Sequence, residues 1–275
     1  MHGSSSASCR QRSRDCSRRT PIEALPARPR RLRVASWNIQ ACRRGIAGVA
    51  QLIASLGVDL IALQEVERGT RAGGGVNQAD FLARAAGFAH VFFLPTLERD
   101  GGDYGIALLS RLPICPRPPL ALPTPAHGEA RLLGLACLAS KALPWGCVTD
   151  RLLTVAFTHL SHRPDRALIR WRQARAIVEA LRVESPCLLL GDFNGLPGTA
   201  MHRTLSAHFC DMFASVGRGR GATHTPLGTC LPGLRIDFLF TSAAIRPRSA
   251  RVVETAASDH HALVGDIELV NATNG

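Results

Sequence analysis

The sequence lacks features that would each indicate a particular class of protein. No apolar run approaches the roughly 18 to 20 residues that a membrane-spanning helix requires, so no transmembrane segment is expected. No fixed period recurs along the 275 residues, which excludes coiled-coil, collagen-like and repeat architectures. The nine cysteines form no Cys-x-x-Cys pair, and therefore neither a zinc knuckle nor a dithiol redox motif is expected.

Lysine and aromatic residues are also scarce. Lys141 is the only lysine, Tyr104 is the only tyrosine, and aromatic residues make up 5% of the chain. So few aromatic side chains give poor support for a protein that stacks single-stranded bases on its surface. The net charge is +12, and nearly all of the basic residues are arginines. This pattern has two explanations. It reflects either the base composition of the coding sequence or a polyanionic substrate such as nucleic acid or a phosphoester.

The N-terminal segment lacks the apolar stretch of a secretory signal. Residues 1–31 are rich in serine and arginine and nearly free of large apolar side chains, which predicts a disordered basic tail. Residues 32–270 show no internal change of composition and are predicted to form one domain, followed by a C-terminal tail over 271–275. The odd number of scattered cysteines is typical of a reducing compartment, and we expect a cytoplasmic monomer.

Between residues 32 and 270, short apolar runs alternate with amphipathic segments, which is typical of an α/β domain. Helical periodicity predicts one helix over 46–56, a second over 80–86 and a third that starts at Pro164. The apolar runs predict strands at Leu32–Ile39, Leu60–Val66, Gly105–Ser110, Leu132–Leu138, Leu152–Leu160, Cys187–Gly191, Ile236–Phe240 and His261–Leu269.

The third helix has an apolar stripe that is expected to face the core. The stripe consists of Leu168, Trp171, Ala174, Val178 and Leu181. The connections 68–78, 113–128 and 218–233 are long, and we expect them to be loops with a functional role.

Polar side chains stand where the apolar runs end or begin. If these strand ends meet at one edge of a sheet, four carboxylates would lie close to amide and imidazole groups. The residues concerned are Asn38, Glu65, His159, Asp192, Asn194, Asp237, Asp259 and His260.

Four neighbouring carboxylates repel one another unless a cation or a protonated histidine lies among them. Oxygen ligands without cysteine favour a hard ion, Mg²⁺ or Mn²⁺, over zinc. Such an ion neutralises a phosphate oxygen, a carboxylate can deprotonate the attacking water, and a histidine backed by an aspartate can hold the phosphoryl oxygens. The constellation therefore predicts phosphoester hydrolysis by in-line attack of water.

The motifs WNI, LQEV, YGIALLSR, THL, GDFN, IDFLF and SDHHALV, in this order, resemble the endonuclease/exonuclease/phosphatase superfamily, which has the DNase I-like fold. The resemblance runs from about Arg33 to Leu269 and is strongest to the small bacterial members. It implies a two-sheet α/β sandwich with helices on the outer faces and a catalytic Mg²⁺ or Mn²⁺ ion.

The resemblance also implies a role for each motif residue. Asn38, Glu65 and Asp259 would hold the metal, and Asn38 would also contact substrate. Asp192 and Asn194 would activate and orient the water. His260 would contact the scissile phosphate. Asp237 would pair with that histidine. His159 would lie near the phosphate or leaving group, and Arg131 would contact a phosphate.

Some positions depart from the pattern or stand outside it. Gln40 occupies a position where the repair enzymes of the superfamily usually have an acidic residue, so abasic-site repair is disfavoured. Ile106 replaces an asparagine that typical members have. His261 is expected to point away from the site because neighbours on an extended segment alternate faces. The histidines without motif context are expected at the surface, namely His162, His202, His208 and His224.

The sequence therefore predicts a metal-dependent phosphodiesterase, with a nuclease of the endonuclease type as the first hypothesis. The alternatives are a sphingomyelinase-like phospholipid phosphodiesterase and a small-molecule phosphatase. The expected partner is nucleic acid or another phosphodiester substrate. A catalytically inactive binding module on the same fold would have lost its metal ligands, and here Asn38, Glu65 and Asp259 remain.

Overall fold

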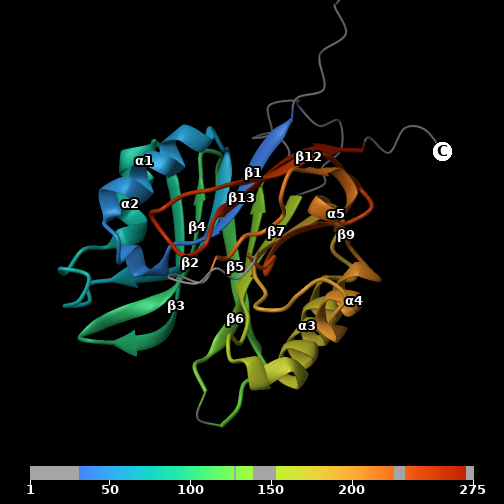
Figure 1. Ribbon diagram of the computed structural model, residues 1–275, viewed down its shortest axis with the longest axis horizontal. Helices are drawn as coiled ribbons and strands as arrows, with labels where there is room; N and C mark the ends of the chain where they lie inside the picture. The colour runs from blue at the N-terminus through green and yellow to red at the C-terminus, as the bar shows by residue number, and fades with distance from the viewer. Residues whose placement is uncertain (1–30, 127, 139–152, 226–232, 271–275) are drawn as a thin grey trace, which may run out of the picture.

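Two mixed β-sheets lie face to face, with helices on their outer sides (Figure 1). The computed structural model describes residues 31–126, 128–138, 153–225 and 233–270. The expected two-sheet α/β sandwich is therefore confirmed. The two predicted tails lie outside the described residues, apart from Arg31. Within these ranges, no helix combines the length and the apolar character needed to cross a bilayer.

The seven-stranded sheet contains, in spatial order, β10 (Gly217–Arg218), β12 (Ile245–Val253), β13 (Ala262–Leu269), β1 (Leu32–Asn38), β2 (Leu60–Arg68), β4 (Gly102–Ser110) and β3 (His90–Arg99). The six-stranded sheet contains β5 (Ile114–Leu122), β6 (Arg131–Leu138), β7 (Leu153–His159), β8 (Cys187–Asp192), β11 (Asp237–Thr241) and β9 (Cys210–Asp211). The helices are α1 (Ile46–Leu56), α2 (Gln78–Ala86), α3 (Ala167–Leu181), α4 (Ala200–Ser206) and α5 (Met212–Val216).

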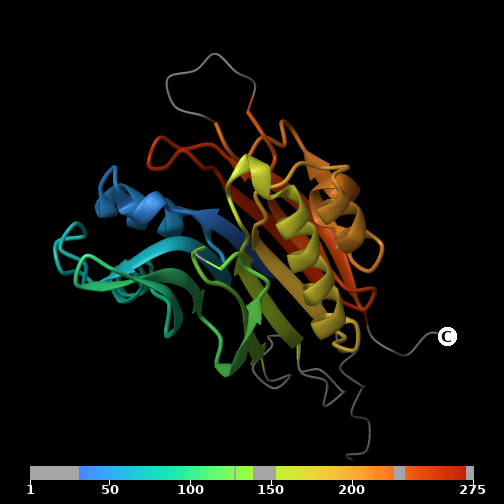
Figure 2. The ribbon, with the colours of Figure 1, turned by 90° about the horizontal axis from the view of Figure 1, so that it is seen from below.

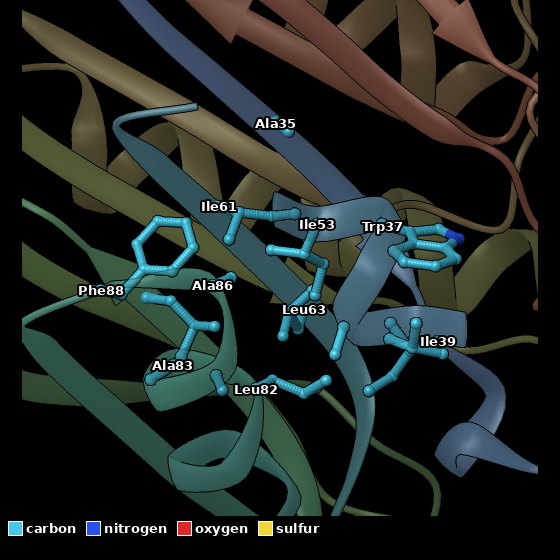
Figure 3. Packing of buried hydrophobic residues seen from close by; sticks show 14 of the residues in the cluster. Ala35, Trp37, Ile39, Ile53, Ile61, Leu63, Leu82, Ala83, Ala86 and Phe88 are labelled. Carbon is cyan, nitrogen blue, oxygen red and sulfur yellow. The ribbon is translucent and has the colours of Figure 1, made fainter. Parts of the chain in front are cut away.

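Three apolar layers hold the sandwich together. The layer between the sheets includes Phe157 and Leu190, and a second layer packs α3 against Phe193 and Phe240. Figure 2 shows α3 lying along the outside of its sheet. The third layer joins α1 and α2 to the seven-stranded sheet around Leu63 and is shown in Figure 3. Because both faces of each sheet are covered, the central strands are nearly continuous apolar runs, which is why the sequence reveals them.

The strand order brings several strand ends to one place. β1 runs parallel to β2, and β7 runs parallel to β8. β11 pairs with β8 in the opposite direction, so β11 begins where β8 ends. The carboxyl ends of β7 and β8 and the start of β11 therefore lie side by side, and the carboxyl end of β1 reaches them from the other sheet through the contact of Asn38 with Asp192.

Two predicted features of the elements are wrong. The segment 113–128, expected to be a loop, contains β5, and β3 and β12 were not foreseen. β5 can be a strand despite Pro116, Pro118 and Pro119 because it is at the edge of its sheet, and its pairing shifts register between Arg117 and Leu120.

The inward face of α3 also differs from the predicted stripe. Leu168 is 55% exposed and Trp171 is only partly buried, while Arg170 and Gln173 are buried in their place. The first turn of the helix faces a loop, residues 160–163, whose backbone groups need polar partners. The apolar periodicity gave the helix correctly but could not show that one end packs on a backbone that needs hydrogen bonds.

Glycine at position 134 should be essential for close packing between the sheets. A Cβ atom there would lie 2.4 Å from Cζ of Phe157 and 2.7 Å from Cδ1 of Leu94, both buried. We expect Gly134→Ala to lower the free energy of unfolding by about 1–3 kcal/mol through overpacking. Urea unfolding followed by circular dichroism measures this.

Gly48 provides the matched control. It lies on the exposed side of α1, and a Cβ atom would meet only the Cβ of Ala257, at 3.8 Å. Gly48→Ala should raise the free energy of unfolding by about 0.5–1 kcal/mol because alanine loses less backbone entropy in a helix. Equal effects of the two substitutions would contradict the packing argument.

Candidate active site

Asp192 is the centre of the polar cluster. In the six-stranded sheet it pairs in register with His159 on one side and Asp237 on the other, so the three side chains form a row. Asn38 reaches the row from the other sheet, where it ends β1. The sequence-predicted strand ends therefore meet, and they do so across the interface between the two sheets.

The Asp192 carboxylate is 1% exposed and has polar groups around it. Its Oδ2 accepts a hydrogen bond from Nδ2 of Asn38 at 3.1 Å, and its Oδ1 accepts one from the backbone N–H of Asn194 at 2.9 Å. Nε2 of His159 is 3.5 Å and Nε2 of His260 is 3.8 Å from Oδ2. Burial, together with the charge of Asp237, raises the pKa of Asp192 to about 6.

Glu65 owes its position to a bulge in β2. The pairing of β2 with β4 shifts register between Gln64 and Val66, and Glu65 has φ of 57°, a left-handed conformation that non-glycine residues rarely adopt. The bulge turns the side chain toward β1, where Nδ2 of Asn38 donates to Oε1 of Glu65 at 3.0 Å. A single amide group thus lies between the carboxylates of Glu65 and Asp192.

Asp259 is held by Gln40, which in the sequence is only a departure from the family pattern. Nε2 of Gln40 donates to Oδ2 of Asp259 at 2.7 Å, and the backbone N–H of Gln40 donates to Oδ1 of Asn38 at 3.0 Å. Ser258 adds a second link, because its hydroxyl donates to the carbonyl oxygen of Asn38 at 2.8 Å. The sequence could not show the contact of Gln40 with Asp259 or that of Ser258 with Asn38, since each joins segments more than 200 residues apart.

His260 and Asp237 form the expected pair. Nδ1 of His260 is 2.9 Å from Oδ2 of Asp237, which leaves Nε2 facing Asp192. Burial by itself would lower the pKa of His260, but the carboxylates of Asp237 and Asp192 outweigh it and raise the pKa to about 10. At neutral pH the raised pKa favours an imidazolium, whose Nδ1 donates to Asp237 and whose Nε2 carries a further proton. The hydroxyl of Thr223 fixes Asp237 by accepting its backbone N–H at 3.1 Å.

His159 and Arg131 lie on the other side of Asp192. Burial and the nearby charge of Arg131 lower the pKa of His159 well below its usual value, so this ring is neutral. The guanidinium of Arg131 is buried, with Nη1 2.9 Å from Oε1 of Glu129 and Nη2 3.3 Å from Nδ1 of His162. Asn194 has a left-handed φ of 49° and donates through Nδ2 to the carbonyl oxygen of Leu160 at 3.1 Å.

The histidines outside the motifs differ from expectation in two cases. His224 was expected at the surface, but its ring is partly buried and centred 4.7 Å from that of His260. A backbone bridge to His260 brings it there, and no local sequence signal marks that bridge. His202 is also partly buried, with Nε2 3.0 Å from Oδ2 of Asp211. His261 contacts Thr225 instead of the site.

Comparison with known proteins gives this geometry a context. The sequence profile of the Endonuclease/Exonuclease/phosphatase family matches residues 35–260. The chain belongs to this family. Members of the family hydrolyse phosphoesters. A search of the curated proteins finds no significant match to the chain.

Several solved structures of the family share the fold. The endonuclease/exonuclease/phosphatase of Beutenbergia cavernae is 24% identical with a TM-score of 0.69, and the match covers 88% of this chain and 72% of that one. The catalytic domain of human nocturnin is 20% identical with a TM-score of 0.64, over 90% and 97% of the two chains. A mannosyl-6-phosphatase of Bacteroides thetaiotaomicron is 15% identical with a TM-score of 0.63, over 86% and 99%.

The raised pKa of His260 predicts a pH dependence of stability in the metal-free protein. Histidine in an unfolded chain has a pKa of about 6.5. The stabilisation from this ring is therefore fully present below pH 6.5 and is lost as the pH rises toward 10. Asp237→Asn removes the strongest raising charge, so the free energy of unfolding should fall less steeply between pH 7 and 10 than in the wild type.

Urea unfolding of both proteins at several pH values in EDTA measures this difference in pH dependence. Thiols that titrate in the same pH range contribute equally to both proteins and so cancel in the comparison. His208→Gln, at an exposed histidine, is the control and should follow the wild-type curve. Parallel curves for Asp237→Asn and the wild type would show that the pair does not hold the proton.

Proposed function

We propose that this protein is a metal-dependent phosphodiesterase that cleaves nucleic acid internally by in-line attack of an activated water. The observation that carries the proposal is the arrangement of Asp192 and His260. A buried carboxylate, ionised at neutral pH, faces a buried imidazolium across 3.8 Å. A base and a cationic donor so close together fit a reaction in which water loses a proton while negative charge grows on a phosphoryl group.

Asp192 takes the role of the base. Its pKa of about 6 leaves it ionised at neutral pH yet basic enough to accept a proton from water. The backbone N–H of Asn194 holds Oδ1, so that the carboxylate keeps one orientation, and Oδ2 faces the two imidazoles. Asn194 therefore acts here by fixing Asp192, with its own amide bound to the Leu160 carbonyl.

His260 takes the role of the donor to the phosphoryl oxygens. Nδ1 is committed to Asp237, so the Nε2 proton is the one that substrate meets. The pKa of about 10 keeps the ring charged throughout the neutral range. The neutral His159 can bind a phosphoryl or leaving-group oxygen without adding charge, because burial and Arg131 lower its pKa.

Two groups of residues could hold a divalent cation. Ligand atoms of Asp192, Asp237 and His260 all lie within 4.8 Å of one another. A cation bound to His260 would first have to displace the proton that Asp237 and Asp192 favour on this ring, which disfavours this set. Glu65, Asp259 and the amide oxygen of Asn38 offer only oxygen atoms, the donors that Mg²⁺ and Mn²⁺ prefer, and we assign the ion to them. When bound, such an ion neutralises phosphoryl oxygens and lowers the pKa of bound water.

Nucleic acid is the substrate class that the charge favours. The chain carries 33 basic residues against 21 acidic ones. A positive surface attracts a polyanionic strand and raises its local concentration. The structural neighbour described as a mannosyl-6-phosphatase makes a small phosphomonoester the second candidate, and a phospholipid is the third. A direct comparison of substrates separates them.

The predicted activity is metal-dependent cleavage of plasmid DNA and bis-p-nitrophenyl phosphate. Asp192→Asn and His260→Gln should each lower kcat by about 10²–10⁴-fold because each removes a proton-transfer or charge-stabilising group. His208→Gln is the control. Mannose 6-phosphate and sphingomyelin are assayed in parallel, with Mg²⁺, Mn²⁺ and EDTA. Turnover of either one with intact plasmid would replace the nuclease assignment, and no turnover of any substrate would overturn the hydrolase mechanism.

The assigned metal ligands predict a separate result. Glu65→Gln and Asp259→Asn should weaken Mn²⁺ binding at least tenfold, because each replaces a charged oxygen ligand by a neutral amide. His260→Gln should leave the affinity nearly the same or raise it, since it removes a positive charge. Isothermal titration calorimetry with Mn²⁺ measures this without substrate. The reverse order of effects would move the ion to the Asp192, Asp237 and His260 set.

A further inference from the structure

A second polar site lies beside the proposed catalytic residues. It is a pocket of about 260 Å³, here called the arginine pocket, and it begins two residues after His159. The side chains that give it its character are Glu129, Arg131, Ser161, His162, Arg163 and Arg166. Three guanidinium groups stand against the carboxylates of Glu129 and the neighbouring Asp165, so the pocket has an excess of positive charge.

Arg131 forms the buried floor of the arginine pocket. The residue is 3% exposed, and its Nε has no hydrogen-bond partner among the residues that the structure describes. Glu129 engages only Nη1, at 2.9 Å. The pocket is lined by Arg131, Arg163 and Arg166, and this lining favours an anionic, oxygen-rich ligand.

Arg163 and Arg166 form the outer rim. Asp165 pairs with both, at 3.1 Å from Nε of Arg163 and 3.7 Å from Nε of Arg166, but its side chain is 59% exposed. An exposed ion pair contributes little energy, so these guanidinium groups can exchange a carboxylate for an incoming anion at small cost. Arginine is also the side chain best suited to bind phosphate with two parallel hydrogen bonds.

The loop that forms the wall of the pocket is held in place from α3. Nη1 of Arg170 donates to the carbonyl oxygens of Ser161 and Arg163, at 2.9 and 2.7 Å. Oε1 of Gln173 accepts the backbone N–H of Ser161 at 3.2 Å, and its Nε2 donates to the Ser161 hydroxyl at 3.1 Å. Arg170 and Gln173 thus satisfy the backbone groups of this loop and hold it in one conformation. The inward face of α3 is polar at this end because the loop needs these hydrogen bonds.

The same loop is attached directly to the catalytic row. The backbone N–H of Leu160 donates to the carbonyl oxygen of Asp192 at 2.9 Å, and the Leu160 carbonyl accepts from Asn194. The arginine pocket and the centre at Asp192 are therefore parts of one rigid unit. The hydrogen bonds of Leu160 thus place the wall of the pocket directly beside the residues around Asp192.

We propose that the arginine pocket binds a second, non-scissile phosphate of the substrate, on the nucleotide next to the bond that is cleaved. This inference rests on the proposed phosphodiesterase function. It names the substrate class more closely, as a nucleotide unit that carries two phosphate groups. One phosphate lies at Asp192 and His260, and the other contacts Arg131, Arg163 and Arg166.

Binding measurements test the pocket without any turnover. The probes are thymidine 3′,5′-bisphosphate and thymidine 5′-monophosphate, titrated calorimetrically in EDTA. The wild type should bind the bisphosphate at least tenfold more tightly. The double variant Arg163→Gln/Arg166→Gln should lose about tenfold of that preference, because it removes two of the three phosphate-binding groups. The rim residues are chosen because loss of the buried Arg131 would also destabilise the chain.

The matched control is Arg172→Gln/Arg182→Gln, which removes the same charge from exposed positions on and just after α3. It should keep the wild-type preference. If both double variants lose the preference equally, the effect comes from net charge and the pocket is refuted. Equal binding of the two thymidine nucleotides by the wild type would refute it as well.

Hydrolysis separates this inference from the proposed function. The substrates are thymidine dinucleotides with and without a terminal phosphate, and the readout is the ratio of their kcat/KM values. The ratio should fall about tenfold in the rim variant and stay constant in the control. Turnover with an unchanged ratio would overturn the pocket alone. A third outcome is that no dinucleotide is hydrolysed, while the wild type still prefers the bisphosphate and the rim variant loses that preference. This result would overturn the hydrolase mechanism and leave the pocket standing.

Discussion

The burial of one carboxylate constrains the rest of this molecule. Asp192 is removed from water at the interface between the two sheets, and its hydrogen bonds come from Asn38 on one sheet and from the turn after its own strand on the other. Both sheets must therefore be complete and correctly aligned before this charge is satisfied. A shift of β8 by one residue would turn Asp192 to the opposite face and leave an unpaired charge in the core.

The acidic side chains at the site have a common physical solution. Asp192 and Asp237 share the charge of His260, while Glu65 and Asp192 share the amide of Asn38. No carboxylate in this group has a cation to itself, and Oδ1 of Asp237 is buried without a partner among the described residues. The carboxylates of Glu65, Asp192 and Asp237 outnumber the single imidazolium of His260, and a bound cation would offset this excess of negative charge.

The parts of this site that follow directly from the order of neighbouring residues can be predicted from the sequence. A polar residue directly after an apolar run is visible in one dimension, so the row around Asp192 could be predicted. Gln40, which orients Asp259, and His224, which packs on His260, could not be found in the same way. Each acts through a contact between distant segments, and neither lies in a periodic or charged pattern. The inward face of α3 was misjudged for a similar reason, because its neighbour is a polar loop.

The prolines of β5 have a consequence for how this chain behaves among its own copies. Pro116, Pro118 and Pro119 remove amide donors from an outer strand, while the opposite edge of that sheet is the two-residue strand β9. In the other sheet, β10 is equally short, and β3 is interrupted where its register shifts between Pro95 and Leu97. Within the described ranges, three of the four outer strands are thus two residues long or contain several prolines, and the longer β3 is divided at Pro95. The sandwich gives an incoming strand little to pair with, and so resists edge-to-edge aggregation.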